Sequence, residues 1–245
     1  MPHSHIVTAF DQELETLTSS IGAMGDFAGN QVSDAVQALL YGDMPLAQRV
    51  VDQDRQIDAL RRDLSASAAI VIARRQPMAG DLDEVLADFR VVEDLERIGD
   101  LAKNIAKRAT AISGTRFPNE LVRSLEDLST LACDQLRQAL ASFAARDAEQ
   151  AMVVRQKDEA IDALHTQIFR DVVSRMGADS TQVVGFVHLL FCAKNIERIG
   201  DHATHVAEAA YLKATGHAPD SERRRLDDSS IVTGTTVAGD LDAVK

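Results

Sequence analysis

The sequence is poor in aromatic residues and in cysteine, and both shortages narrow the choice of fold. Aromatic residues make up 4% of the 245 residues, and there is no tryptophan. The two cysteines, Cys133 and Cys192, are too few and too far apart for a disulfide framework or a zinc motif. Both stand among apolar residues at helical spacing, so we expect buried, reduced thiols.

Long apolar runs and an excess of positive charge are also missing. The longest apolar runs, 68–73 and 184–193, fall short of the ~20 residues that span a bilayer. The first residues lack the basic and apolar segments of a signal peptide. With 38 acidic and 26 basic residues the net charge is −12, which argues against nucleic acid as a partner. We therefore expect a cytoplasmic protein that is not inserted in the membrane and reaches the inner membrane only through partner proteins.

Sequence motifs of catalysis are absent as well. The chain has no Glu-x-x-His of the kind that binds two irons in helical bundles. It has no glycine-rich phosphate loop and no recognisable pairing of a nucleophile with a base. The sequence therefore predicts a protein that is not an enzyme.

What the sequence does contain is helical periodicity over most of its length. Alanine, leucine, valine, aspartate and arginine dominate, as is typical of helical bundles. Asp43 followed by Pro45 is a helix start, and Gly114 and Gly216 are helix ends. The patterns predict an all-α fold with six helices, at about 5–41, 43–75, 81–113, 118–146, 147–176 and 180–216.

The second half of the chain repeats the first. The pentapeptide ERIGD occurs at 96–100 and again at 197–201, an offset of 101 residues. An Asp-x-x-Ile-Asp motif occurs at 54–58 and again at 158–162, an offset of 104 residues. We therefore predict two tandem three-helix bundles, over residues 1–114 and 115–217. Residues 218–245 have no periodic apolar face, and we expect them to be a disordered tail.

Each repeat carries two pairs of acids four residues apart, which places both carboxylates of a pair on one helix face. The eight acids are Asp54, Asp58, Glu96, Asp100, Asp158, Asp162, Glu197 and Asp201. Like charges one turn apart cost about 0.2–0.5 kcal/mol per pair. A solvated acidic face, paired with neighbouring arginines, would account for one such pair. Four pairs at equivalent positions favour metal binding instead, with Mg²⁺, Mn²⁺ or iron as suitable ions.

Several neighbouring residues extend this hypothesis. Gly99 and Gly200 precede the last acid of each ERIGD, although glycine costs about 1 kcal/mol inside a helix. Something must therefore approach the backbone closely at these positions. Asn104 and His205 lie one turn beyond the motifs, and Glu93 lies one turn before the first, so these three are further candidate ligands. An imidazole at the second site would favour iron, zinc or nickel.

These motifs resemble those of the PhoU family over about residues 5–216. The resemblance rests on RQPMAGDL at 75–82, followed by DLERIGD at 94–100. It implies two three-helix bundles in tandem, with metal clusters on the eight acids given above. It also implies a homodimeric or larger, non-enzymatic negative regulator of the phosphate-starvation response. Such a regulator would link the ATPase of the phosphate ABC transporter to a sensor histidine kinase when phosphate is plentiful.

The sequence departs from the family pattern at two places. Asp83 stands where a basic residue is expected, and Lys194 with Asn195 replaces acidic residues. Two other functions stay open beside the adaptor. One is a hydrolase in which carboxylate-bound metals activate water. The other is a metal-free helical interaction module.

Overall fold

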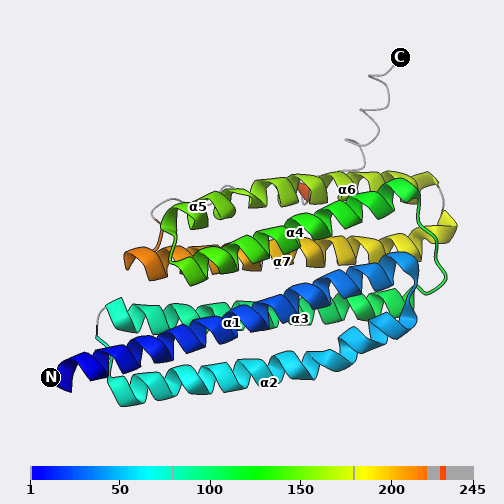
Figure 1. Cartoon of the computed structure of the whole chain (residues 1–245). Coiled ribbons are helices and arrows are strands. Elements are labelled where there is room, and N and C mark those ends of the chain that lie inside the picture. Colours follow the sequence, from blue (N-terminus) through cyan, green and yellow to red (C-terminus); the bar gives the residue numbers. More distant parts are fainter. Residues whose placement is uncertain (1, 79, 179, 220–226, 230–245) are drawn as a thin grey trace.

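The chain folds into two packed three-helix bundles, which confirms the predicted all-α tandem architecture (Figure 1). The computed structural model describes residues 2–78, 80–178, 180–219 and 227–229, and these contain no strand. The first bundle consists of α1 (Pro2–Tyr41), α2 (Met44–Arg75) and α3 (Gly80–Ala111). The second consists of α4 (Asn119–Ala145), α5 (Ala148–Gln156), α6 (Asp158–Ala178), a short 3-10 turn η1 (Ser180–Gln182) and α7 (Val183–Thr215).

Local sequence signals set most helix ends. The backbone N–H of Leu46 donates to Asp43 Oδ1 at 2.9 Å, so Asp43 caps α2, and Pro45 lies in its first turn. At the other end of α2, Gln76 adopts a left-handed conformation with φ 48°, directly before a proline. Gly216 closes α7 with φ 79°, a conformation that glycine adopts without strain.

One helix differs from the expectation. The sequence predicts a single fifth helix over 147–176, but a turn at Lys157 divides this segment into α5 and α6. Around the turn, Lys157 N–H donates to the carbonyl of Val154, and Ala160 N–H donates to the carbonyl of Lys157. Both bonds span three residues instead of four, so the helix tightens locally and restarts. Together α5 and α6 occupy the place that α2 occupies in the first bundle.

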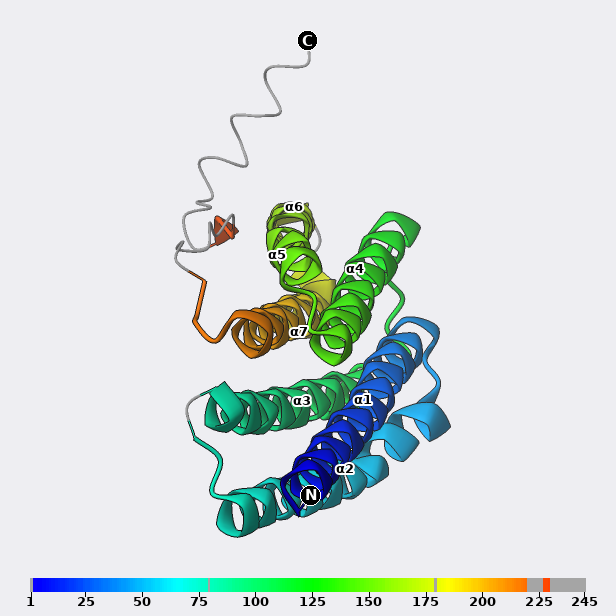
Figure 2. The same cartoon turned by 60° about the vertical axis from the view of Figure 1, so that its left-hand side comes forward.

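The two bundles share one apolar core. Helix α3 packs against α7, and α1 packs against α4, so two helices of each bundle face the other bundle (Figure 2). Fully buried side chains of these two helices include Leu95 and Ile105 of α3 and Leu189 and Ile196 of α7. The α3–α7 seam therefore lies at the centre of the molecule, and residues from both repeats meet there.

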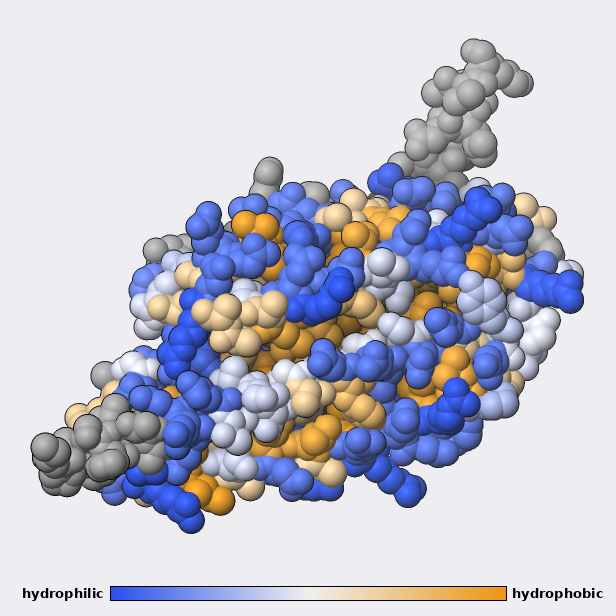
Figure 3. All heavy atoms as spheres, in the orientation of Figure 1, coloured by the Kyte–Doolittle hydropathy of each residue, from blue (hydrophilic) through white to orange (hydrophobic). Residues whose placement is uncertain are grey.

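The surface is polar over most of the face shown in Figure 3, with apolar side chains gathered where α1 meets α4. A groove lies along this contact and is lined in part by Val36, Leu40 and Cys133. Cys133 is half-buried and Cys192 is buried, and neither forms a disulfide. Within the described part of the chain, no helix is both long enough and apolar enough to cross a membrane.

The predicted disordered tail, 218–245, lies largely outside the described residues. Of its described residues, 227–229 lie against the second bundle. The backbone N–H of Asp228 donates to Thr166 Oγ1 of α6 at 3.1 Å. This contact brings the acidic pair Asp227 and Asp228 to the α6–α7 side of the molecule.

Candidate metal centres

At the glycine of each ERIGD motif, a side chain of a neighbouring helix packs directly against the backbone. A Cβ on Gly99 would lie 2.6 Å from Cδ1 of Ile57, and a Cβ on Gly200 would lie 2.8 Å from Cδ1 of Ile161. Ile57 and Ile161 are the isoleucines of the two Asp-x-x-Ile-Asp motifs. The expected close approach is therefore real, and an isoleucine makes it. This packing holds the two acid motifs of each bundle face to face.

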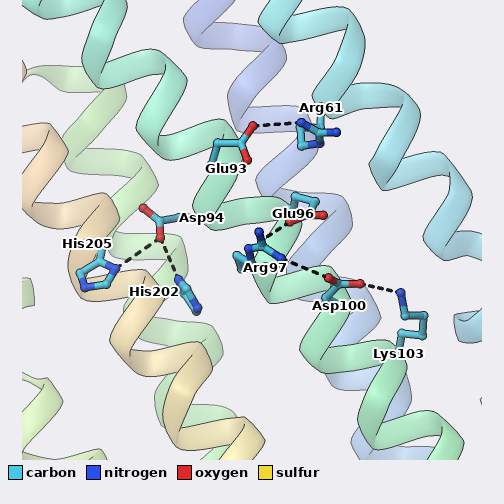
Figure 4. A network of polar contacts seen from close by, with 9 residues as sticks. All are labelled: Arg61, Glu93, Asp94, Glu96, Arg97, Asp100, Lys103, His202 and His205. Carbon is cyan, nitrogen blue, oxygen red and sulfur yellow. Dashed lines mark hydrogen bonds and ion pairs between the residues drawn. The ribbon is translucent and has the colours of Figure 1, made fainter.

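The first centre lies between α2 and α3. Asp54 and Asp58 project from α2, and Glu96 and Asp100 project from α3. Nζ of Lys103 lies 2.8 Å from Oδ2 of Asp54 and 2.5 Å from Oδ1 of Asp100, so one ammonium group joins both motifs. The arginine inside the motif, Arg97, lies beside Glu96 and Asp100 at 3.5 and 3.7 Å (Figure 4).

Burial and charge oppose one another in this centre. Burial raises the pKa of Glu96, and the neighbouring Arg97 offsets this only in part. Burial alone would lower the pKa of Lys103, but its hydrogen bonds to Asp100 and Asp54 outweigh that effect and raise it. The lysine is therefore a fixed positive charge, placed where the carboxylates of two helices meet.

The second centre lies between α6 and α7 and is more deeply buried. Asp158, Asp162 and Glu197 are each no more than 4% exposed, and Asp201 is half-buried. The hydroxyl of Thr204 donates to Oδ1 of Asp158 at 3.2 Å. Burial raises the pKa of Glu197 to about 7, although the Lys194 ammonium opposes the shift.

The described part of the tail contributes an acid to this second centre. Nζ of Lys194 lies 2.8 Å from Oε1 of Glu197 and 2.7 Å from Oδ2 of Asp227. The other Asp227 oxygen lies 3.3 Å from Nδ1 of the buried His165. Burial opposes the ionisation of Asp227, but hydrogen bonds from Lys194 and Ser229 outweigh it and lower its pKa.

Three acids of the two centres each have one buried carboxylate oxygen that accepts no hydrogen bond from the described part of the chain. Among the described residues, Asp54 Oδ1, Glu96 Oε2 and Glu197 Oε2 are buried and receive no hydrogen bond. Buried carboxylate oxygens without a donor are costly, and a bound cation would satisfy them. The oxygen chemistry of each centre suits the metals expected from the motifs, but, within the residues that the structure describes, no three of its carboxylates offer ligand atoms within 4.8 Å of one another.

The further candidate ligands are exposed, and two of them contact residues outside the two centres. Glu93 is exposed, and its carboxylate pairs with Arg61 of α2 at 3.1 Å. Asn104 is exposed on α3. Nδ1 of His205 lies 3.3 Å from Asp94, an acid of α3 in the other bundle (Figure 4).

Several residues of this region were not predicted from the sequence. They are Lys103, Thr204, Asp227 and the buried Gln31, whose side-chain amide has no hydrogen-bond partner within the described residues. An alignment of the two repeats contains a usable signal for two of them. Lys103 and Thr204 stand 101 residues apart, so they occupy equivalent positions with different chemistry.

Comparison with known proteins decides the family. The family model described as PhoU domain matches the chain twice, over residues 21–109 and 125–210. The chain belongs to the PhoU family. It is 46% identical over 236 residues to the phosphate-specific transport system accessory protein PhoU homolog of Rhizobium meliloti (strain 1021), covering 96% of this chain and all of the relative. A PhoU homolog of Caulobacter vibrioides is 39% identical, covering 91% of this chain and 97% of the relative.

Solved PhoU structures share the fold. The crystal structure of PhoU from Pseudomonas aeruginosa matches with a TM-score of 0.79 and 34% identity, covering 85% of this chain and all of that chain. The PhoU structure from Streptococcus pneumoniae matches with a TM-score of 0.78 and 25% identity, over 86% of this chain and all of that one. The two matched PhoU domains coincide with the two bundles, which confirms the internal repeat.

Proposed function

We propose that this chain is a regulatory accessory protein of phosphate transport and has no catalytic activity of its own. The observation that carries this proposal is the full-length match to a relative named as a phosphate-specific transport system accessory protein. The match includes both PhoU domains and therefore both candidate centres. A role in regulation also agrees with the absence of a catalytic motif from the sequence.

The more specific proposal is an adaptor in the cytoplasm. It would bind the ATPase of the phosphate ABC transporter and a sensor histidine kinase. When phosphate is plentiful, it would repress the phosphate-starvation response. It would act as a homodimer and reach the inner membrane through these partners. Membership of the PhoU family supports this assignment, together with a strongly acidic surface that favours basic patches on partner proteins.

Deletion of the gene in its own bacterium tests the regulatory role. At high phosphate, we expect the deletion strain to take up more phosphate and to express a phosphate-starvation reporter that the parent keeps silent. Reintroducing the wild-type gene restores repression. Unchanged uptake and unchanged reporter output in the deletion strain would contradict the proposal. Co-purification of the tagged transporter ATPase or the kinase with this chain tests the adaptor role separately.

The proposal includes divalent or iron-type metals at the two carboxylate centres. Their test is elemental mass spectrometry of protein purified without chelators or affinity tags. The test variant combines Glu96→Gln, Asp100→Asn, Glu197→Gln and Asp201→Asn. The control variant removes two glutamates and two aspartates that are exposed elsewhere, by Glu15→Gln, Asp63→Asn, Asp127→Asn and Glu149→Gln.

We expect the test variant to hold fewer metal ions per chain than the wild type and the control variant, which should hold equal amounts. Both variants carry the same net charge, so nonspecific attraction of cations is matched between them. Equal metal content in the two variants would show that the centres are not metal sites. The same pair of variants, reintroduced into the deletion strain, shows whether repression depends on the bound metal.

A further inference from the structure

A histidine pair and an aspartate meet across the seam between the bundles, outside both carboxylate centres. Oδ1 of Asp94 on α3 lies 2.8 Å from Nδ1 of His202 and 3.3 Å from Nδ1 of His205, both on α7. The two imidazole rings meet edge to face with centroids 5.6 Å apart. Figure 4 shows both rings turned toward the same carboxylate oxygen. We call these three residues the seam triad.

The seam triad has the spacing of a metal site. Its three ligand atoms lie within 4.8 Å of one another, and it is the one such group of histidine, cysteine or acidic side chains found among the described residues. In a tetrahedral zinc site with bonds of about 2.0–2.2 Å, neighbouring ligand atoms lie about 3.3 Å apart. The observed separations of 2.8 and 3.3 Å are close to that value. Small side-chain movements would therefore suffice to admit an ion.

The donor chemistry narrows the choice of metal. Two imidazole nitrogens and one carboxylate oxygen suit Zn²⁺, Ni²⁺ or Co²⁺ better than Mg²⁺ or Ca²⁺, which prefer oxygen ligands. Three protein ligands leave a fourth position for water. His205 has 47% of its side-chain surface exposed, whereas Asp94 and His202 have 15% and 17%. The site is therefore pre-formed on its inner side and open to solvent on one side.

We propose that the seam triad binds a transition-metal ion of the zinc class and that this ion joins the two repeats. One ligand comes from the first repeat and two come from the second, so the ion would cross-link α3 to α7 at the centre of the molecule. The ion would take the place of the hydrogen bonds that now join the two Nδ1 atoms to Asp94. This inference does not depend on the proposed role in phosphate transport.

The internal repeat shows that the seam triad is specific to one place. Each member has a counterpart 101 positions away along the matching helix. The counterparts are Asn195 for Asp94, Leu101 for His202 and Asn104 for His205. None of these three is a strong metal ligand. The seam triad therefore occurs once in the chain, whereas the acid motifs occur in both repeats.

The competing explanation is a plain ion pair between Asp94 and its histidines. Zinc binding to the full chain separates the two explanations. The chain is first freed of metal with a chelator and then titrated with Zn²⁺ at pH 7.5 by calorimetry. The same titration with Co²⁺ reports the coordination number through its visible absorption. The test variant is His205→Asn, because this half-exposed side chain can be changed without emptying the core.

Two control variants make the result specific. His217→Asn removes an imidazole just beyond the end of α7, outside the seam triad. The fourfold acid variant, with Glu96→Gln, Asp100→Asn, Glu197→Gln and Asp201→Asn, weakens the carboxylate centres and keeps the seam triad. We expect the wild type, His217→Asn and the fourfold variant each to bind one equivalent of Zn²⁺ at the seam triad and to gain thermal stability. We expect His205→Asn to bind this Zn²⁺ ion at least tenfold more weakly and to show no increase in thermal stability when Zn²⁺ is added.

X-ray absorption at the zinc edge identifies the ligands directly. The expected spectrum shows scattering from two imidazole rings in the wild type and from one or none in His205→Asn. If the wild type and His205→Asn had equal zinc affinity and equal increases in thermal stability with zinc, the proposal would be overturned. The absence of any zinc-dependent stabilisation of the wild type would also overturn it and would leave the ion pair as the explanation.

Discussion

The two carboxylate centres occupy equivalent places in the two bundles, yet the groups that compensate their charge are different. In the first centre, Lys103 bridges Asp54 and Asp100. Its counterpart in the second centre is Thr204, which offers only a hydroxyl to Asp158. Duplication has thus kept the carboxylates in both bundles, while the neighbouring positive charge differs between them.

The second centre obtains its positive charge from another position. Lys194, one turn before Glu197, contacts both Glu197 and Asp227, whereas its counterpart in the first repeat is the acid Glu93. The first centre is therefore balanced by a lysine between the motifs, and the second by a lysine at its edge. Equal carboxylates in unequal surroundings should bind cations with unequal affinity.

Equivalent positions of the two repeats also differ in charge at the seam between the bundles. Near one end, Nζ of Lys213 lies 2.9 Å from Asp88 Oδ1, and both side chains are buried. The residues at the equivalent positions of the other repeat are Ile112 and Leu189, which are buried and apolar. One fold therefore accommodates an ion pair at one position and an apolar pair at the equivalent one. Each of the following predictions tests one of these differences.

Breaking the buried ion pair should have the largest effect. Lys213→Ile leaves Asp88 without its cation, and we expect it to lower the free energy of unfolding by about 3–5 kcal/mol. Adding Asp88→Leu reproduces the apolar pair of the other repeat and should recover most of this loss. Urea denaturation of both variants measures the difference. A double variant as unstable as the single one would contradict this account.

The same pair should make stability depend on pH. Burial raises the pKa of Asp88 to about 6, even with Lys213 beside it. A folded-state pKa above the unfolded value means that the folded chain binds the proton more tightly. The contribution of Asp88 to stability is therefore complete below about pH 4 and falls as the pH rises to about 6, by at most roughly 3 kcal/mol.

Comparison with Asp88→Asn isolates this contribution, because asparagine does not titrate. The free energy of unfolding of the wild type minus that of the variant should decrease between about pH 4 and pH 6. Thermal or urea denaturation at half-unit intervals of pH measures it. A difference that stays constant or increases over this range would show that Asp88 is ionised throughout.

The glycine contacts should come next in size. Gly99→Val pushes a branched side chain into Ile57 and should cost about 2 kcal/mol, because overpacking a helix contact typically costs 1–3 kcal/mol. Gly200→Val should cost less, since its contact with Ile161 is less tight. Shortening the partner, as Ile57→Ala or Ile161→Ala, should relieve part of the cost in each double variant. If the stability losses of the two single variants simply add in the double variant, the glycine is not needed to make room for the isoleucine.

The smallest expected effect concerns the cations of the two centres. Lys103→Met removes the ammonium group from the first centre and should tighten Mn²⁺ binding there about tenfold. Thr204→Lys places an ammonium group in the second centre and should weaken binding there by a similar factor. Paramagnetic resonance of free Mn²⁺ measures both affinities. Lys107→Met, an exposed lysine one turn further along α3, is the control and should change neither.

The helix ends and the repeat were predictable because their causes are local. Asp43 and Pro45 start a helix wherever they are placed, and an apolar face recurs along the chain without reference to its neighbours. The two ERIGD motifs exposed the duplication directly. The break at Lys157 was missed, because the residues around it have ordinary helix propensities and the periodic pattern continues through it.

The candidate site was predictable only as far as one helix determines it. The acid pairs follow from a spacing of four residues, and the pairing of each ERIGD with an Asp-x-x-Ile-Asp motif follows from the repeat. The partners that stabilise these acids were not predictable. Asp227 reaches Lys194 from outside the helices, and His205 faces Asp94 instead of the second centre.

Periodicity, helix caps and repeats are short-range properties, so they were enough to predict a duplicated helical bundle with carboxylate pairs on its helices. Which charges meet depends instead on contacts between residues far apart in the sequence. Lys213 contacts Asp88 from 125 residues away, and Asp94 contacts two histidines more than 100 residues further along the chain. Such contacts depend on how each helix is rotated about its axis, and the packing of all the helices together fixes that rotation.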